Sequence, residues 1–217
     1  MNKHPVIRYG NTANGLWVVW GKIMYEEFYI KLKDDEWPLD YIDHDRQTVR
    51  AIVFDSENHF DLTFYFVRAF RDDDFGKAAI IETSGGGVEP GENFPDALRR
   101  ELREELGAEV EIICKLGVVE DYYNLIHRHN VNHYYLCKAI SFGETNLTED
   151  ERNEFHLSAL KLDYQEAVRE YERRADTKLG RLIARRELPV LQYAKKVIDG
   201  GAGSGSESYD KVNWVQK

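Results

Sequence analysis

The sequence predicts an α/β protein of the α+β type, in which a mixed β-sheet lies between helices. Two observations indicate this fold class. From residue 47 onward, apolar runs typical of strands alternate with segments of helical periodicity, without the strict strand–helix–strand rhythm of a parallel sheet. Hydrophobic residues make up 42% of the 217 residues and aromatic residues 12%, so the chain can build a core and is not a disordered protein.

The first predicted strands follow one another closely. Residues 47–54 (QTVRAIVF) and 62–70 (LTFYFVRAF) are runs of β-branched, aliphatic and aromatic residues, and the polar residues 55–61 separate them. Residues 78–83 (AAIIET) predict a third, shorter strand. The residues that follow, 84–93 (SGGGVEPGEN), predict a loop, because glycine and proline interrupt regular structure.

Residues 94–106 (FPDALRRELREEL) predict a helix with signals at both ends. Asn93 is a favourable N-cap residue, Pro95 is tolerated in the first turn, and Gly107 is a typical residue after the last turn. The second half of the chain is expected to contain, in order, two long strands, a polar acidic loop, a strand, and two or three helices with a break near Pro189: residues 109–124, 129–142, 142–154, 155–162, 163–175, 177–187 and 188–199.

The predicted domain organisation is a central domain of residues 25–199 with different segments at its ends. Residues 1–24 are expected to be an N-terminal extension that could include a strand, since the domain can begin after the second methionine, Met24. Residues 200–207 are a Gly/Ser linker by composition, and residues 208–217 are an appended segment or tag. Whether the ends are natural or engineered stays open, as does the alternative that both ends are strands that pair with each other or extend the sheet.

The net charge of −10 limits the expected partners. An acidic surface repels phosphate backbones and anionic lipids, which argues against a nucleic-acid polymer or a membrane as partner. A small phosphorylated ligand is still compatible, because a bound divalent cation can invert the local field. The first residues lack the apolar core of a signal peptide, and no apolar run approaches ~18 residues. Cys114 and Cys137 lie in apolar runs, as expected of buried free thiols, so a cytoplasmic protein is expected.

Three glutamates on the predicted helix do not form an ordinary solvent-exposed face. On a helical wheel with about 100° per residue, Glu101, Glu104 and Glu105 occupy an arc of roughly 100°. The same helix carries a stripe of leucines, namely Leu98, Leu102 and Leu106. The glutamate arc borders this stripe, whereas a solvated face would lie opposite to it. The carboxylates are therefore expected at the rim of the core.

These carboxylates favour a cation site. Like charges three and four residues apart on a helix repel each other by a few tenths of a kcal/mol per pair. Carboxylate oxygens suit Mg²⁺ or Mn²⁺. The preceding Gly85, Gly86 and Gly87 permit close approach of the backbone, so a carbonyl oxygen there could be a further ligand. The alternative is an acid-rich surface helix that is stabilised by ion pairs such as Asp96 with Arg100.

The stretch from Gly86 to Ala108 carries a family resemblance. Gly86, then Glu92 after five intervening residues, then the run RELREELGA from Arg100 after seven more, resemble the Nudix box, the signature of the Nudix (MutT-like) hydrolases. Ala108 is the one departure, since the family usually has a bulkier aliphatic residue there. The resemblance implies the family's fold, an α/β/α sandwich with a mixed sheet between helices, over residues 49–198.

The resemblance also implies a chemistry. Members of the family hydrolyse the pyrophosphate of a nucleoside diphosphate linked to another moiety, with Mg²⁺ or Mn²⁺ as cofactor. By the resemblance, Glu101, Glu104 and Glu105 bind the metal, and one of them could also be the base. Gly86 would add its backbone carbonyl, and Arg100 belongs to the catalytic set by orienting the helix carboxylates.

Further site residues follow from the same resemblance. Gly86, Gly87 and Glu92 are expected to position the loop. Some family members carry an additional carboxylate before a late strand, and the matching place here is the acidic loop that precedes residue 155. Glu154 is the first choice for this catalytic carboxylate and Glu151 the second, with a solvated acidic loop as the alternative.

Substrate-binding candidates lie beyond the box. Tyr122, Tyr123 and His127 are placed where they could contact a substrate, although core tyrosines are the alternative. His127, His129 and His133 share one strand parity, so they could also face one side of the sheet, as a zinc site, as the polar lining of a substrate mouth or as plain surface.

The family does not define the substrate. ADP-ribose or a nucleotide sugar, a dinucleoside polyphosphate and a modified dNTP all stay open as the small-molecule nucleotide partner. A homodimer is compatible with the sequence. The rival hypothesis is a catalytically quiet Nudix-like binding or scaffold module that carries engineered terminal extensions.

Overall fold

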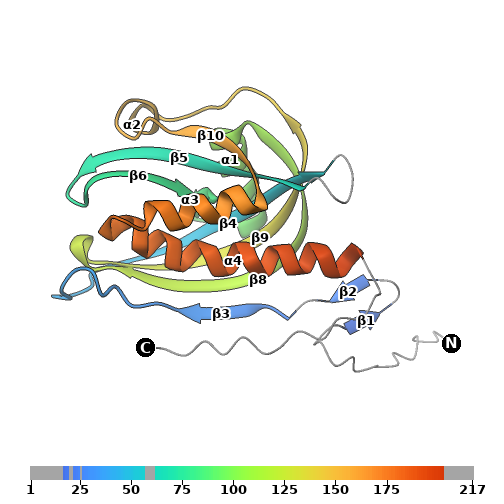
Figure 1. The fold of residues 1–217 in the computed structure, drawn as a ribbon, viewed down its shortest axis with the longest axis horizontal. Coiled ribbons are helices and arrows are strands. Elements are labelled where there is room, and N and C mark those ends of the chain that lie inside the picture. Colours follow the sequence, from blue (N-terminus) through green and yellow to red (C-terminus); the bar gives the residue numbers. More distant parts are fainter. Residues whose placement is uncertain (1–16, 20–21, 25, 57–61, 203–217) are drawn as a thin grey trace. The chain divides into compact units, whose positions relative to one another are not determined.

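The computed structural model describes residues 17–19, 22–24, 26–56 and 62–202 (Figure 1). The chain divides into two compact units, residues 1–26 with 196–217 and residues 27–195. In the smaller unit, strands β1 (Trp17–Val19) and β2 (Lys22–Met24) pair antiparallel. The larger unit contains the main sheet, and the candidate site lies within it.

The main sheet is mixed, as the sequence predicts. Its central order is β10-β5-β4-β9-β8-β3, with β6 paired to β5 and β7 paired to β4. The β4–β9 and β3–β8 pairs are parallel, and the other pairs are antiparallel. The strands are β3 (Phe28–Lys31), β4 (His44–Ser56), β5 (Leu62–Asp73), β6 (Gly76–Glu82), β7 (Ser84–Gly87), β8 (Ala108–Tyr123), β9 (Arg128–Phe142) and β10 (Ser158–Asp163).

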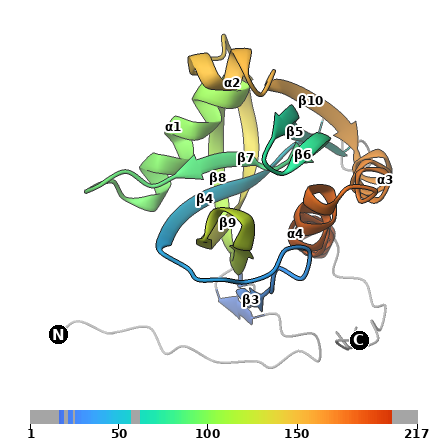
Figure 2. The same cartoon turned by 90° about the vertical axis from the view of Figure 1, so that its left-hand side faces the viewer.

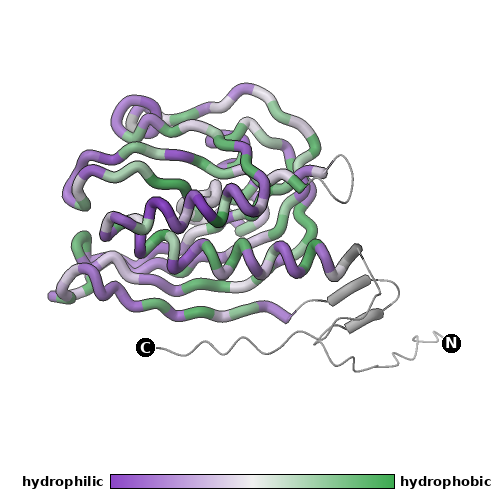
Figure 3. Tube along the Cα trace, in the orientation of Figure 1, coloured by the Kyte–Doolittle hydropathy of each residue, from purple (hydrophilic) through white to green (hydrophobic). Residues whose placement is uncertain are grey.

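Helices cover both faces of this sheet. Figure 2 shows α1 on one side and α3 with α4 on the other, which confirms the predicted layered α+β fold. The helices are α1 (Phe94–Leu106), the short 3₁₀ helix η1 (Asn124–Ile126), α2 (Glu149–Asn153), α3 (Tyr164–Arg174) and α4 (Lys178–Ala202). Hydrophobic and hydrophilic residues alternate along α4 (Figure 3), as expected of a helix with one buried face. Within the described residues, no helix has the length and apolar character needed to cross a membrane.

The bounds of α1 match the prediction at both ends. The Asn93 side chain accepts a hydrogen bond from the Asp96 backbone N–H over 3.0 Å. Gly107 has a φ of 65°, and its N–H donates to the carbonyl of Arg103 over 3.0 Å. A Cβ at Gly107 would lie 2.3 Å from the carbonyl oxygen of Gly143, so glycine also permits close approach of that chain segment.

The leucine stripe of α1 is fully packed against the sheet. Leu98 and Leu102 are 0% exposed, and they share a core cluster with Val49 and Val53 of β4. Burying one such leucine contributes about 1.5–3 kcal/mol. This packing fixes the rotation of α1 about its axis, and so it holds the adjacent glutamates at the edge of the core.

Two predicted loops contain regular structure. Residues 84–87, predicted as loop, form strand β7, because Ser84 pairs with Ala51 and Gly87 with Thr48 of the neighbouring β4. This pairing requires glycine at position 85, because a Cβ there would lie 2.1 Å from the Val49 carbonyl oxygen.

The predicted acidic loop, residues 142–154, contains the short helix α2. Thr148 begins it with a reciprocal cap: its N–H donates to the Glu151 side chain over 2.8 Å, and its Oγ1 accepts from the Glu151 N–H over 3.3 Å. The strand predicted at residues 155–162 begins only at Ser158 and extends to Asp163.

The predicted helix break near Pro189 is wrong, since α4 continues through it. Proline removes a hydrogen bond and costs about 3 kcal/mol inside a helix. Val190, Leu191 and Ala194, which follow it, are each 0% exposed, and their burial offsets this loss.

The end segments are only partly described. The predicted extension of residues 1–24 contains strands β1 and β2. The linker predicted to begin at residue 200 starts within α4, which ends at Ala202. The segment 208–217 lies outside the described residues.

Candidate active site

Glu105, on the last turn of α1, is held by strand β7. Ser84 Oγ and the backbone N–H of Gly85 both donate hydrogen bonds to Glu105 Oε2, over 2.7 Å and 2.8 Å. The Glu105 side chain is buried, and this burial raises the pKa of its carboxyl group to about 8. Burial of Glu105 therefore favours its protonated form in the absence of a bound cation.

Arg100 connects the other carboxylates of the box. Its Nη1 donates to Glu101 over 2.7 Å and to Glu104 over 3.2 Å. Its Nε and Nη2 form a two-point contact with Glu92, over 3.1 Å and 3.0 Å, and Nη2 also donates to the Gly87 carbonyl over 3.0 Å. The guanidinium of Arg100 thus connects the carboxylates of α1 with strand β7 and with the loop that contains Glu92. Its contact also holds the pKa of Glu92 below its usual range.

Gly86 lies directly against Glu101. A Cβ on Gly86 would lie 2.5 Å from Glu101 Oε2, so any larger residue would displace this carboxylate. Burial raises the pKa of Glu101, and the nearby Glu104 and Glu151 carboxylates raise it further. Because the backbone of residue 86 lies so close to the Glu101 carboxylate, this position requires glycine.

The chemistry of these donors fits a hard divalent cation. Glu105 is buried and has no ion pair among the described residues, while Glu92, Glu101 and Glu104 share one guanidinium, so a divalent cation would add positive charge that these carboxylates lack. Among the residues that the structure describes, no three His, Cys, Asp or Glu side chains form a ready metal cluster. The reason is that Arg100 holds Glu101 and Glu104, while Glu105 faces β7. To bind a cation, the carboxylates would exchange these contacts for it, with the Gly86 carbonyl beside them.

A cavity of about 650 Å³ lies against these side chains, a volume that suits a small molecule. One side is formed by Glu101, Glu104, Glu105 and the backbone of residues 85–87, which together are called the carboxylate wall. Arginines are the most frequent charged residues elsewhere in the lining: Arg46, Arg50, Arg71, Arg128 and Arg186. The cavity thus joins an acidic side to a basic one.

Arg186 of α4 forms the centre of a buried polar network at the cavity. It is 2% exposed, and it donates to Asp121 over 3.1 Å, to the Tyr123 hydroxyl over 2.9 Å and to Glu187 over 2.8 Å. Tyr134 donates to the same Glu187 carboxylate over 3.0 Å. A charge that is buried and paired in this way fixes α4 against β8 and β9, and it makes the floor of the cavity rigid.

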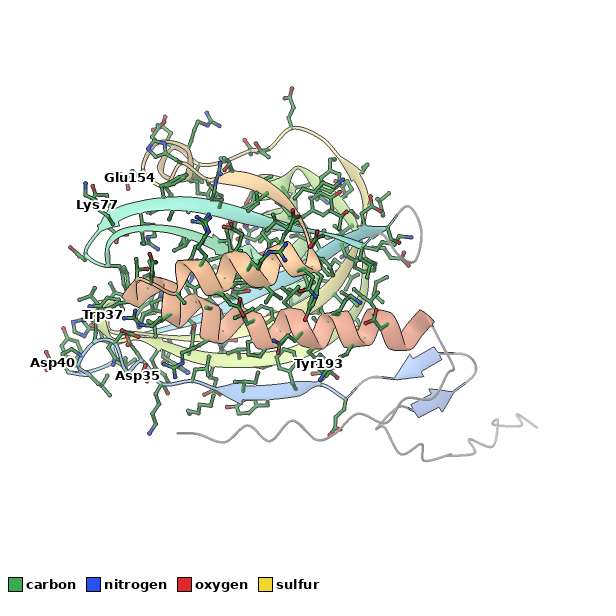
Figure 4. All side chains as sticks on the ribbon, in the orientation of Figure 1. Asp35, Trp37, Asp40, Lys77, Glu154 and Tyr193 are labelled. Atoms are coloured by element: carbon green, nitrogen blue, oxygen red, sulfur yellow. The ribbon has the colours of Figure 1, made fainter. Side chains whose placement is uncertain are left out.

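The two candidates for the additional carboxylate differ in their position relative to α2: Glu151 lies within this helix, and Glu154 follows its last residue. Glu151 lines the cavity and acts electrostatically on Glu101, whereas Glu154 is exposed and does not line it. Figure 4 shows Glu154 at the periphery beside α2. The structure therefore favours Glu151, the second choice from sequence, over Glu154, because the short helix turns residue 151 inward.

Of the three substrate-binding candidates, the structure brings one to the cavity. Tyr123 lines it, and burial raises the pKa of its hydroxyl to about 12. Tyr122 points to the other face of β8, where its ring stacks on His129 at 4.7 Å between centroids. His127 has a φ of 52° and stacks on Tyr41 at 3.9 Å, outside the cavity lining.

The histidines predicted to share one side do not converge. His129 contacts Asp45 over 2.8 Å, and His133 contacts Gln47 over 2.8 Å further along β9. His127 lies in the turn before β9, so the strand parity does not extend to it.

Several residues of the site carry no local signal in the sequence. Ser84 directly precedes the glycine run, but only the packing of β7 on α1 pairs it with Glu105. Arg46 and Arg128 meet through the pairing of β4 with β9, and Arg186 reaches the cavity from α4. These residues are far apart in the chain, so spacing could not identify them.

Comparison with known proteins agrees with the geometry. A sequence model of the NUDIX domain matches residues 44–181, well over half of the chain. The solved structure of a NUDIX hydrolase from Nitrosomonas europaea superposes with a TM-score of 0.51 at 17% identity, covering 72% of this chain and 90% of that chain, which is a likeness of fold.

Curated relatives match over short segments. Nucleoside triphosphatase NudI of Enterobacter sp. (strain 638) is 69% identical over 29 residues, which are 13% of this chain and 21% of that protein. NudI of Escherichia fergusonii is 83% identical over 24 residues, 11% of this chain and 17% of that protein. The chain thus spans about a fifth of the length of these relatives. The domain match covers both the sheet and the carboxylate helix, and the chain belongs to the Nudix family.

Proposed function

We propose that the protein is a divalent-metal-dependent pyrophosphohydrolase that acts on a nucleoside diphosphate linked to another moiety. The observation that carries the proposal is the carboxylate wall. Glu101, Glu104 and Glu105 lie side by side on α1, against the backbone of Gly86, at one end of a cavity of about 650 Å³. Glu105 is buried with no ion pair among the described residues, and Glu101, Glu104 and Glu92 share the single guanidinium of Arg100, so a cation would stabilise this group of carboxylates.

Each residue has a role in this proposal. A bound Mg²⁺ or Mn²⁺ would offset the charge of the pyrophosphate oxygens and lower the pKa of the attacking water. Glu101, Glu104 and the Gly86 carbonyl are the donors that would hold it, with Glu105 close to them. Arg100 positions Glu101 and Glu104 through its shared contacts.

The chemistry at the reacting phosphate is a displacement by water. Water attacks one phosphorus of the pyrophosphate, the bond from that phosphorus to the bridging oxygen breaks, and the attacking water loses a proton. Glu151 is the carboxylate that lies on the cavity apart from α1, so it replaces Glu154 in the proposed catalytic set as a residue that could accept this proton.

The substrate panel follows from the family and from its relatives. ADP-ribose or a nucleotide sugar, dinucleoside polyphosphates and modified dNTPs are the classes predicted from the sequence. The name of the NudI relatives adds ordinary nucleoside triphosphates to these. The free thiols of Cys114 and Cys137 suit a reducing compartment, so a cytoplasmic location is part of the proposal.

The test is phosphate release from this panel with Mg²⁺, together with thermal denaturation with and without the metal. The proposal predicts turnover of at least one class and a rise in melting temperature on addition of metal. If no substrate is cleaved and metal does not shift the melting temperature, the rival hypothesis of a quiet binding module holds instead.

A further inference from the structure

The arginines around the cavity fall into two groups. Four of them have carboxylate partners: Arg50 lies 3.2 Å from Glu82, Arg71 2.5 Å from Asp73, Arg100 2.7 Å from Glu101 and Arg186 3.1 Å from Asp121. Arg46 and Arg128 differ from these four. Within the described part of the chain, neither guanidinium has an ion pair or a side-chain hydrogen bond, and together they are called the arginine wall.

The pairing of two strands places Arg46 and Arg128 on the same side of the sheet. Strands β4 and β9 are parallel, with His44 opposite Arg128 and Arg46 opposite Asn130. Residues two apart on a strand share a face, so Arg46 and Arg128 are diagonal neighbours facing the cavity. Arg46 Nη2 lies 3.0 Å from where a Cβ of Gly87 would be. The arginine wall therefore begins directly beside the carboxylate wall.

This arrangement is unfavourable in the free protein. Both guanidinium groups are half-buried, and the Nε of Arg128 is fully buried without a hydrogen-bond partner. Burial lowers the pKa of both side chains; the neighbouring Arg50 lowers the pKa of Arg46 further, and Arg46 does the same for Arg128. The one aromatic contact of Arg128 among the described residues is the ring of Tyr123, 5.3 Å from its Cζ to the ring centroid.

The missing partner is an anion. The chain carries 39 acidic residues against 29 basic ones, and yet no described carboxylate forms an ion pair with these two cations; Glu82 and Glu101 act on Arg46, and Asp121 on Arg128, only from a greater distance. Two adjacent guanidinium groups offer forked donors that match the oxygens of a phosphate group. A carboxylate wall at one end of a cavity and unpaired arginines beside it suit a chain of phosphates that extends from one to the other.

We propose that Arg46 and Arg128 form a second anion subsite, which binds a phosphate group of the substrate beyond the diphosphate that is cleaved. This rests on the proposed function and narrows it to substrates with an additional phosphate. Such a phosphate has two sources: the third phosphate of a nucleoside triphosphate, or a phosphate on the sugar of a dinucleotide.

Binding without catalysis is the first test. Inorganic tripolyphosphate is titrated into the metal-free protein by calorimetry, with the wild type, Arg46→Gln, Arg128→Gln and the double variant. The double variant is expected to bind at least about 10-fold more weakly. Arg173→Gln, an exposed position on α3 with the same change of charge, is expected to bind like the wild type. Equal affinity of the wild type and the folded double variant overturns the proposal.

Kinetics then distinguish the two phosphate sources. ATP is compared with ADP, and NADPH with NADH, for the wild type and the double variant. A loss of kcat/KM of about 10-fold or more for ATP alone identifies a third phosphate in the chain, and the same loss for NADPH alone identifies a sugar phosphate. Equal small losses for all four contradict the subsite. Arg46→Lys and Arg128→Lys, which keep the charge, are expected to retain part of the wild type's preference for the substrate with the additional phosphate.

The two proposals can fail separately. If nothing is hydrolysed but tripolyphosphate binding depends on both arginines, the subsite stands and the enzymatic proposal falls. If hydrolysis proceeds but neither arginine affects tripolyphosphate binding or the choice of substrate, the enzymatic proposal stands and the subsite falls.

Discussion

The two walls of the cavity are built on opposite principles. In the carboxylate wall, Glu101 and Glu104 share Arg100, and Glu105 accepts from Ser84 and Gly85. In the arginine wall, neither guanidinium has a carboxylate partner within the described residues. In the first wall, protein groups hold the carboxylates beside one another before any ligand arrives, and a cation would take the place of those contacts. The second lacks its partner until a ligand supplies it, as is expected of a site for recognition.

The largest expected effect comes from removing one charge of the carboxylate wall. Glu104→Gln keeps the shape of the side chain and removes its charge, so kcat is expected to fall at least ~100-fold in a steady-state phosphate-release assay. Glu105→Gln is expected to lower kcat to a similar extent. Glu104 is half-exposed, so the melting temperature of Glu104→Gln should change little.

The control for this pair is Glu109→Gln, an exposed position at the start of β8 with the same change of charge. It should turn over like the wild type. Near-normal turnover of Glu104→Gln, or its unfolding, would count against the role assigned to the carboxylate wall.

The geometry of the same wall is tested at Gly86. A Cβ there would lie 2.5 Å from Glu101 Oε2, so Gly86→Ala has to displace a carboxylate by a large part of an ångström. We expect a loss of kcat of about 10- to 100-fold, since small misplacements of catalytic groups have effects of that size. Gly143→Ala, where the nearest atom is 3.9 Å from the new Cβ, is the control and should be fully active. Equal activity of the two variants would show that Glu101 is not held as described.

The buried carboxyl of Glu105 predicts a pH dependence of stability in the metal-free protein. Its pKa is raised by burial to about 8 in the folded state, against an ordinary value near 4.5 in the unfolded chain. The folded state therefore holds the proton more tightly, and Glu105 lowers the free energy of unfolding progressively as the pH rises from about 4.5 to about 8. Glu105→Gln removes this effect.

The measurement is chemical denaturation of the wild type and Glu105→Gln at several pH values with a chelator present. The variant should gain stability relative to the wild type as the pH rises, by an amount on the order of a few kcal/mol at the upper end. A difference that does not vary with pH would contradict the buried, cation-free carboxyl.

The smallest expected effects are changes in the free energy of unfolding. They concern Arg100, which contacts the carboxylate wall, and Arg46 of the arginine wall. Arg100→Gln breaks contacts to three carboxylates and should lower the free energy of unfolding by about 1 kcal/mol, because it leaves Glu101 without its partner. Arg46→Gln removes an unpaired, half-buried cation and should raise the free energy of unfolding by about 0.5–1 kcal/mol. Urea denaturation at neutral pH measures both. Destabilisation by Arg46→Gln of more than about 1 kcal/mol would reveal an internal partner and weaken the case for a ligand.

The sequence predicts the carboxylate wall because its determinants are local. Asn93, Gly107 and the leucine stripe lie within one helix and its caps, and the spacing of the glutamates orders them on one side. Strand β7 could not be predicted from local sequence, because its glycines form a strand only by pairing with β4. Glu151, which lies within the one-turn helix α2, reaches the cavity, whereas Glu154, which follows that helix, does not.

The arginine wall could not be predicted for the same physical reason. Arg46 and Arg128 are brought together by the parallel pairing of β4 and β9, two strands that residues 57–127 separate in the chain. Arg186 comes from the far side of the sheet on α4, in a helix that sequence patterns break at Pro189. Contacts between elements distant in the chain depend on topology, which periodicity does not encode.

The proposed function requires the carboxylate wall to support cleavage of a pyrophosphate bond by water with a divalent cation. The most direct measurement is incubation of the wild type with ATP, ADP-ribose, a dinucleoside polyphosphate and a modified dNTP in oxygen-18-labelled water, with Mg²⁺ or with a chelator, followed by mass spectrometry of the products. We expect cleavage of at least one substrate only with Mg²⁺, with one labelled oxygen in one product per bond broken, and at least ~100-fold less cleavage with Glu104→Gln. Cleavage that persists in the chelator or in Glu104→Gln, or the absence of cleavage in all samples, would contradict the proposed function.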